Sequence, residues 1–184
     1  MSKQWKKDYE QQLSLAEKSI YPMVRKFYES NYNKGVDNFI NTGSTDYPSL
    51  FKYGDLEKLY IDMYETVAMR FAKWYARYFD KYEQKGTDPK KFITIWLIAF
   101  NNYAKQNAAT NVVLVSGTAK KSLIKITQRL MSDPDFATTG ADEKARILRK
   151  QFKRYSRVQA LRLVRTESAR AGNYGIEQSA MKVY

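Results

Sequence analysis

The sequence has 184 residues, a length that suits one domain or one compact body with an arm. It contains neither cysteine nor histidine, which excludes disulfides, thiolate chemistry, the usual zinc sites and any Ser-His or Cys-His catalytic pair. The formal net charge is +13, the start is polar rather than signal-like, and no apolar run is long enough to span a bilayer, so we expect a soluble, non-membrane protein.

The first expected element is a long helix over 3–40. Its apolar residues recur every three or four positions and form one stripe, consisting of Trp5, Tyr9, Leu13, Ala16, Ile20, Val24 and Phe27. Pro22 interrupts the stripe. Since proline removes one backbone hydrogen bond and clashes with the preceding turn, we expect a kink or a restart near Tyr21.

A Gly-, Ser- and Pro-containing loop is expected over 41–54, followed by a second helix over 55–85 with Asp55 as N-cap and Gly86 as its stop. This helix is rich in aromatic residues, from Tyr60 to Tyr82. Aromatic side chains beside Lys and Arg can stack on single-stranded nucleic acid. The interpretation we favour is that they fill a core, because they recur at helical spacing.

A third helix should begin at Asp88-Pro89 and end near Asn107. Because it is apolar on nearly all sides, we expect it at the centre of a bundle. Residues 108–118 are ambiguous: their valines favour a strand, but a lone strand has nothing to pair with, so an extended linker or a continued helix is preferred. Gly117 is the expected stop of this stretch.

Thr118 can then cap a short basic helix over 119–131, with Lys120, Lys121, Lys125 and Arg129 exposed, and 133–142 should be a loop. The predicted fold class is all-α: an elongated helical bundle with a long kinked N-terminal helix and a basic C-terminal segment. We predict a helical core over 1–117 and a basic segment over 118–184, or one continuous domain containing both.

The positive charge is concentrated in the C-terminal third, where 118–170 contains 14 Lys and Arg against five Asp and Glu. In the helix that Asp142 should cap, one direction collects six cations: Arg146, Arg149, Lys150, Lys153, Arg154 and Arg157. The opposite side is expected to pack, through Ile147, Leu148, Phe152, Tyr155 and Val158. Such a row repels itself, which favours an anionic partner over a merely solvated face.

One acid stands out in the following stretch, RLVRTESARAGNYGIEQSA (162–180). Glu167 falls on the same helical face as Ala160, Leu163 and Ala171, so it should be buried. A buried carboxylate is costly unless it is paired. Arg170, Arg162, or a cation or backbone amide from another helix could be the partner, and we predict a structural role for Glu167 rather than a catalytic one.

This stretch is similar to the signature helix of the phage Mu F-like head-morphogenesis family, the minor head or minor capsid proteins. The matching positions are Leu163, Val164, Arg165, Thr166, Glu167, Ala169, Asn173, Gly175, Glu177 and Ala180. The opening tryptophan and long first helix also resemble the family. Many members continue into a small domain with paired cysteines and a histidine, and this sequence contains neither residue type.

The resemblance implies a non-enzymatic virion component that associates with the portal or the capsid interior. It implies a role in head assembly and in genome packaging, retention or delivery, with the protein in the host cytoplasm during assembly. The expected partners are the portal and double-stranded DNA bound without sequence preference. We expect no cofactor, no metal and no small-molecule substrate.

Two other interpretations remain open. One is a helical module that binds nucleic acid without sequence preference and has no virion role; no helix-turn-helix spacing suggests specific readout. The other is an enzyme such as a toxin-like transferase, against which the all-helical pattern and the missing site chemistry argue.

Overall fold

The computed structural model describes residues 3–47, 49–83 and 88–183, and within these ranges it contains helices and no strand. The elements are α1 (Lys3–Thr42), α2 (Tyr53–Glu83), the short 3-10 helix η1 (Pro89–Phe92), α3 (Ile93–Met131), α4 (Pro134–Thr138) and α5 (Ala141–Val183). The all-α prediction is therefore confirmed for the described part of the chain.

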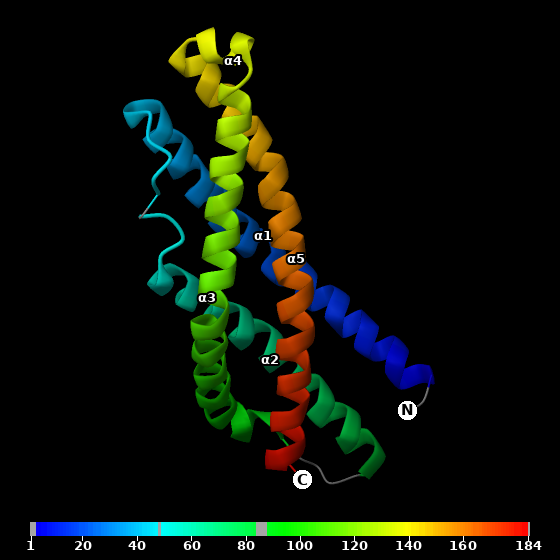
Figure 1. Cartoon of the computed structure of the whole chain (residues 1–184). Coiled ribbons are helices and arrows are strands. Elements are labelled where there is room, and N and C mark those ends of the chain that lie inside the picture. The colour runs from blue at the N-terminus through cyan, green and yellow to red at the C-terminus, as the bar shows by residue number, and fades with distance from the viewer. Residues whose placement is uncertain (1–2, 48, 84–87, 184) are drawn as a thin grey trace.

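The long helices form two antiparallel pairs that cross each other (Figure 1). Helices α1 and α2 run in opposite directions on one side, and α3 and α5 run in opposite directions across them, joined at one end by α4. Helix α5 packs along both α1 and α2, whereas α3 packs chiefly on α2. The centre of the molecule is thus the contact of α5 with the α1–α2 pair.

The first helix is longer and less interrupted than expected. α1 continues through Pro22 as one helix, so the predicted restart near Tyr21 is wrong. Pro22 is exposed, whereas Ile20 and Val24 on either side are buried. The proline ring and the backbone carbonyl left without a partner therefore face solvent, which lowers the cost of proline inside the helix.

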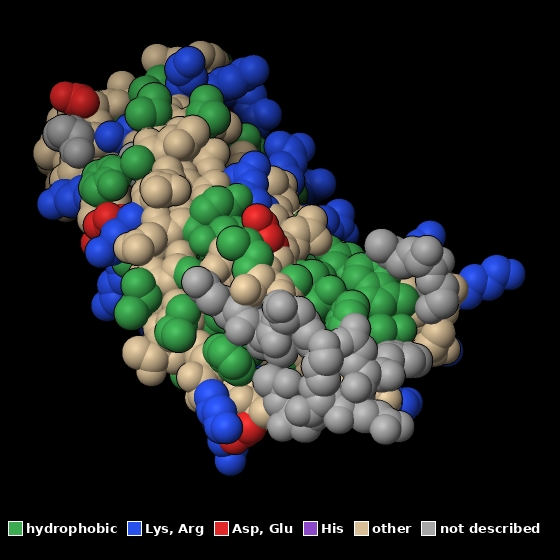
Figure 2. All heavy atoms as spheres, turned by 90° about the horizontal axis from the view of Figure 1, so that it is seen from below, with side chains coloured by type: hydrophobic (Ala, Val, Ile, Leu, Met, Phe, Trp, Pro, Cys, Tyr) green, Lys and Arg blue, Asp and Glu red, His purple; other side chains and the backbone are tan. Residues whose placement is uncertain are grey.

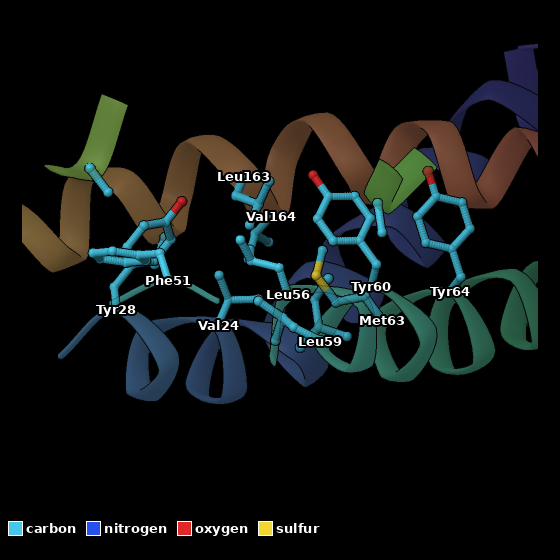
Figure 3. Close-up of a cluster of buried hydrophobic side chains, with 14 of the residues drawn as sticks. Val24, Tyr28, Phe51, Leu56, Leu59, Tyr60, Met63, Tyr64, Leu163 and Val164 are labelled. Carbon is cyan, nitrogen blue, oxygen red and sulfur yellow. The ribbon is translucent and has the colours of Figure 1, made fainter. Parts of the chain in front are cut away.

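The aromatic residues of α2 fill the core, as the favoured interpretation held. Tyr60, Tyr64 and Phe71 are fully buried. Figure 3 shows Tyr60 and Tyr64 rising from α2 with their hydroxyl groups directed toward α5. The predicted cap Asp55 lies in the first turn, since the helix begins two residues earlier, and the predicted stop Gly86 lies outside the described residues.

Helix α3 differs most from expectation. It does not end near Asn107 but continues to Met131, so Gly117 is not a stop, Thr118 is not a cap, and the boundary placed between 117 and 118 falls inside a helix. Ala119 and Leu123 beyond the glycine are buried. Their packing outweighs the roughly 0.5–1 kcal/mol that a mid-helix glycine costs.

α3 is also not the central helix that its apolar sequence predicted. Trp96 and Phe100 are buried, but Ile95 and Ile98 are 46% and 59% exposed. One face packs on α2 and the other carries apolar side chains to the surface. The sequence pattern could not distinguish this from burial on all sides.

The segment 133–142, expected to be a loop, contains α4. Asp133 caps this helix by accepting a hydrogen bond from the Asp135 backbone N–H at 3.0 Å, Pro134 follows as the first helical residue, and Phe136 is buried. The same Asp-Pro start precedes η1, as predicted at Asp88. Helix α5 begins one residue before Asp142, which therefore lies in its first turn.

Small residues line the contact between α2 and α5. Ala68, Ala72 and Ala76 of α2 are fully buried, and on α5 the inward positions include Ala171, Gly172 and Gly175. A Cβ atom on Gly175 would lie 2.3 Å from the backbone oxygen of Ala68. The two backbones can approach this closely only because the residue at 175 has no side chain.

Candidate nucleic-acid interface and signature helix

All six cations predicted for the first half of α5 are exposed on that helix, while Leu148 and Phe152 on the opposite side are buried. The six are Arg146, Arg149, Lys150, Lys153, Arg154 and Arg157. Ile147 and Tyr155 are half-buried. Val158, expected to pack, is instead 41% exposed, because it lies at the edge of α5 that faces α3.

Two of the six cations have acidic partners. Arg146 pairs with Glu143 one turn earlier, and Arg149 pairs with Asp37 of α1 at 2.5 Å. For the other four, no ion pair occurs within the described part of the chain. Lys150, Lys153, Arg154 and Arg157 follow at three- and four-residue intervals. They form what we call the cation stripe, about 10 Å long at 1.5 Å per residue.

The sequence around the stripe contains no acid that could neutralise it. There is no Asp or Glu from 144 to 166, and none in the whole of α3, over 93–131. Of the α3 lysines predicted to be exposed, Lys121 and Lys125 are exposed and Lys120 is half-buried. Helix α3 and the 144–166 stretch of α5 therefore carry only positively charged side chains.

The structure brings cations of α3 and α5 together, which sequence reasoning missed. A cavity of about 390 Å³ opens between the two helices, and Lys125 and Arg129 line it from α3 and Arg154 from α5. Helical periodicity places each cation on a face of its own helix. It does not show that these two faces meet, because that depends on how the hairpin closes.

Glu167 is buried and paired, at 2% exposure. The Tyr64 hydroxyl donates a hydrogen bond to Glu167 Oε2 at 2.8 Å, and Arg170 Nη1 donates to Oε1 at 2.9 Å. Arg170 was among the predicted partners and Arg162 is not one. Tyr64, 103 residues away along the chain, was missed, because its place in an aromatic pattern carries no sign of a polar partner.

Burial raises the pKa of Glu167 above its ordinary value, although the hydrogen bond from Tyr64 and the charge of Arg170 act in the opposite direction. Burial also raises the pKa of Tyr64, helped by the adjacent carboxylate, so this tyrosine remains a neutral donor. These hydrogen bonds fix the position of α5 along α2 and the rotation of α5 about its own axis. Both carboxylate oxygens of Glu167 accept a hydrogen bond from a side chain that packs at this contact.

The other signature residues divide into surface and packing positions. Arg165 and Thr166 are exposed, while Gly175 is buried against α2. Asn173 accepts a hydrogen bond from the Tyr9 hydroxyl at 2.9 Å and so connects α5 to α1. Tyr174 stacks on Tyr103 of α3 with ring centroids 3.9 Å apart. The signature thus contacts all three of the other long helices.

Among the described residues, no group of three or more acidic side chains is placed to hold a metal ion, and no helix is long and apolar enough to cross a membrane. Seen from below in Figure 2, Lys and Arg side chains predominate over acidic ones around apolar patches. Comparison of the chain with protein-family models, with curated proteins and with solved structures finds no match in any of the three.

Proposed function

We propose that this protein is a phage minor head protein that binds packaged double-stranded DNA through its backbone phosphates and contacts the portal or the inner capsid during head assembly. The observation that carries the DNA-binding part is the cation stripe on a stretch without acids. The virion role is supported by the resemblance of 162–180 to the head-morphogenesis signature helix.

The stripe suits phosphates better than bases. It lies on a continuous helix, and phosphate contacts require only positive charge at the right spacing, which a row of Lys and Arg supplies. Binding of this kind is independent of sequence and falls steeply with salt. Each phosphate contact contributes about 0.9 to the slope of log affinity against log salt on duplex DNA.

The test is a triple charge reversal of Lys150, Lys153 and Arg157 to Glu. Arg149 is left unchanged, because a glutamate there would face Asp37 and disturb the fold. Fluorescence anisotropy with two unrelated duplexes should show equal binding by the parent chain. The variant should lose that binding while keeping its helical circular dichroism, and charge removal to Gln should reduce the salt slope by about 2.7.

The matched control reverses three cations outside the stripe, namely Lys3, Lys6 and Lys7 near the start of α1, and changes the net charge by the same amount. DNA binding that falls equally in both variants would reflect net charge only and would contradict a defined interface. Binding that the stripe variant retains would also contradict it.

The virion role needs a separate measurement. The portal protein encoded in the same genome should co-purify with this chain, and assembled heads should contain it. A nucleic-acid-binding module without a virion role is the second candidate, favoured by the same stripe. That candidate predicts DNA binding in the anisotropy assay but no portal complex.

A further inference from the structure

The α3–α5 seam is open over part of its length, although Ser122 and Tyr155 share a hydrogen bond across it at 2.9 Å and Tyr103 stacks on Tyr174 farther along. The cavity with Lys125, Arg129 and Arg154 adjoins a second one of about 250 Å³, one helical turn along each helix. On α3 the lining positions run from Asn111 to Arg129, and on α5 from Gln151 to Glu167. We call this combined surface the α3–α5 groove. The two walls are similar in length, about 27 Å of helix on α3 and about 24 Å on α5.

The lining residues recur at three- and four-residue spacing on both walls. They are Asn111, Leu114, Val115, Thr118, Ser122, Lys125, Ile126 and Arg129 on α3, and Gln151, Arg154, Tyr155, Val158, Gln159, Arg162, Leu163, Thr166 and Glu167 on α5. This spacing is the one with which antiparallel helices present a seam to another helix in a bundle. The two walls of the groove therefore resemble two neighbouring helices of a bundle, and the side on which a further helix would pack faces solvent.

The groove combines an apolar interior with positive rims. Leu114 is 66% exposed and Val158 41%, and Ile126 lines the same cavity as Val158. Lys125, Arg129 and Arg154 stand at one end and Arg162 at the other. The only acid that lines it is Glu167, whose charge is already engaged by Arg170.

Two buried polar groups at the end of the groove that Arg162 lines have no hydrogen-bond partner in the described structure. They are the hydroxyl of Tyr60, which is fully buried, and Nε2 of Gln159. Burial raises the pKa of Tyr60, so its hydroxyl remains a neutral donor. Both groups are hydrogen-bond donors that are closed off from solvent.

From these observations we infer that the α3–α5 groove binds an acidic amphipathic helix of about four turns, supplied by a protein partner. The apolar stripe of that helix covers Leu114, Ile126 and Val158, and its carboxylates meet the cations on the rims. Helix-in-groove binding uses this combination of an apolar seam and complementary charge. The inference does not rest on the virion role, and it concerns a different surface from the outer part of the cation stripe.

Two other occupants fit the groove less well. Duplex DNA would satisfy the rim cations, but its phosphates would leave the apolar interior uncovered. A second copy of this chain carries a net charge of +13, so its approach to a groove with positive rims is opposed electrostatically.

The probe is a fluorescent helical peptide of about 16 residues with leucines at heptad spacing and glutamates flanking them. Two control peptides are used: one has lysine in place of every glutamate, and the other has the same composition with the leucines moved off the stripe. At physiological salt, anisotropy should show binding of the acidic striped peptide and at least about tenfold weaker binding of both controls. Equal binding of the rearranged peptide would overturn the inference, because charge alone would then explain it.

Variants of the chain locate the binding. Val158→Asp places a carboxylate in the groove at a partly exposed position that should tolerate it, and Arg154→Glu reverses a rim charge. Each should weaken peptide binding by about tenfold or more, whereas the matched outward reversal Lys153→Glu should change it by less than about threefold. The opposite ranking would overturn the inference. Circular dichroism and thermal melting confirm that each variant is folded.

Two further readouts separate the alternatives. Val158→Asp should leave duplex DNA binding largely intact, since it touches only the groove, so failure of the peptide experiment and failure of the proposed DNA binding can be told apart. Displacement of the peptide by stoichiometric duplex DNA would instead place DNA in the groove. Concentration-dependent dimerisation in sedimentation runs, abolished by Val158→Asp, would make a second copy the occupant. Either result would overturn the acidic-helix inference.

Discussion

Helix α5 packs on α2 along its C-terminal half and runs beside α3 along its N-terminal half, and the two contacts differ in the size and charge of their side chains. Against α2 it presents alanines, glycines and one paired acid, so the backbones approach closely. Beside α3 it presents Arg154, Val158 and Arg162, and the seam stays open. One helix therefore makes a close backbone contact with α2 and borders an open cavity beside α3.

The difference follows from what each side chain needs. Small residues gain contact only when the helices touch, because they have little surface of their own to bury. Arginine and lysine keep their charged ends in water and hold neighbouring helices apart unless an acid lies between them. We therefore expect substitutions in the α2–α5 contact to change stability and substitutions beside α3 to change binding.

The largest loss is expected from Glu167→Ala. It leaves the buried Tyr64 hydroxyl without a partner and creates a void, so the free energy of unfolding should fall by about 3 kcal/mol. Arg170 is 38% exposed and can turn to water, which limits the loss. Urea unfolding followed by circular dichroism measures this. A variant as stable as the parent would show that the pair does not fix α5 on α2.

Gly175→Ala should come next. The new Cβ would lie 2.3 Å from the Ala68 backbone oxygen, so the helices must separate, and overpacking of this kind costs about 1–3 kcal/mol. Gly172→Ala is the comparison, because its Cβ meets the ring of Phe71 at 2.8 Å, and a side chain can move where a backbone cannot. In thermal melts, Gly175→Ala should have a lower melting temperature than Gly172→Ala. The reverse order would contradict the close approach of the two backbones at residue 175.

A smaller effect is expected from pH. Because burial raises the pKa of Glu167 in the folded state, the stabilisation linked to its proton is fully present below the ordinary carboxyl pKa and is lost as pH rises through the raised value. The parent chain should therefore lose stability relative to Glu167→Gln as pH rises above the ordinary carboxyl pKa. Urea titrations of both chains across this range measure the difference. A difference that grows in the parent's favour with rising pH would mean that Arg170 lowers the pKa instead.

The smallest effect should be a gain. Gly117 lies inside α3 with open space around its Cβ position, so Gly117→Ala should stabilise the chain by about 0.5–1 kcal/mol. Binding of the acidic peptide should be unchanged, because Gly117 does not line the groove. Destabilisation would contradict a continuous α3 through this position.

What the sequence by itself determined is local. Helical periodicity was sufficient to predict an all-helical chain, to place the six cations of α5 on one exposed face and to assign Glu167 to a buried one. It failed at Pro22, Gly117 and Asp133, where a breaker or a cap signal competes with packing. The helix continues through Pro22 because the proline lies on its exposed face. The helix continues through Gly117 because Ala119 and Leu123 are buried.

Only the tertiary structure decided which faces meet. The Tyr64 partner of Glu167, the Asp37 partner of Arg149 and the contact of Gly175 with Ala68 join residues more than 100 positions apart. The α3–α5 groove exists because α3 continues as a helix through 108–118 and α5 then runs back beside it in the opposite direction. A repeat of 3.6 residues defines which residues of a helix share a face. Which other helix covers that face depends on how the two helix pairs cross, and every long helix contributes to that crossing.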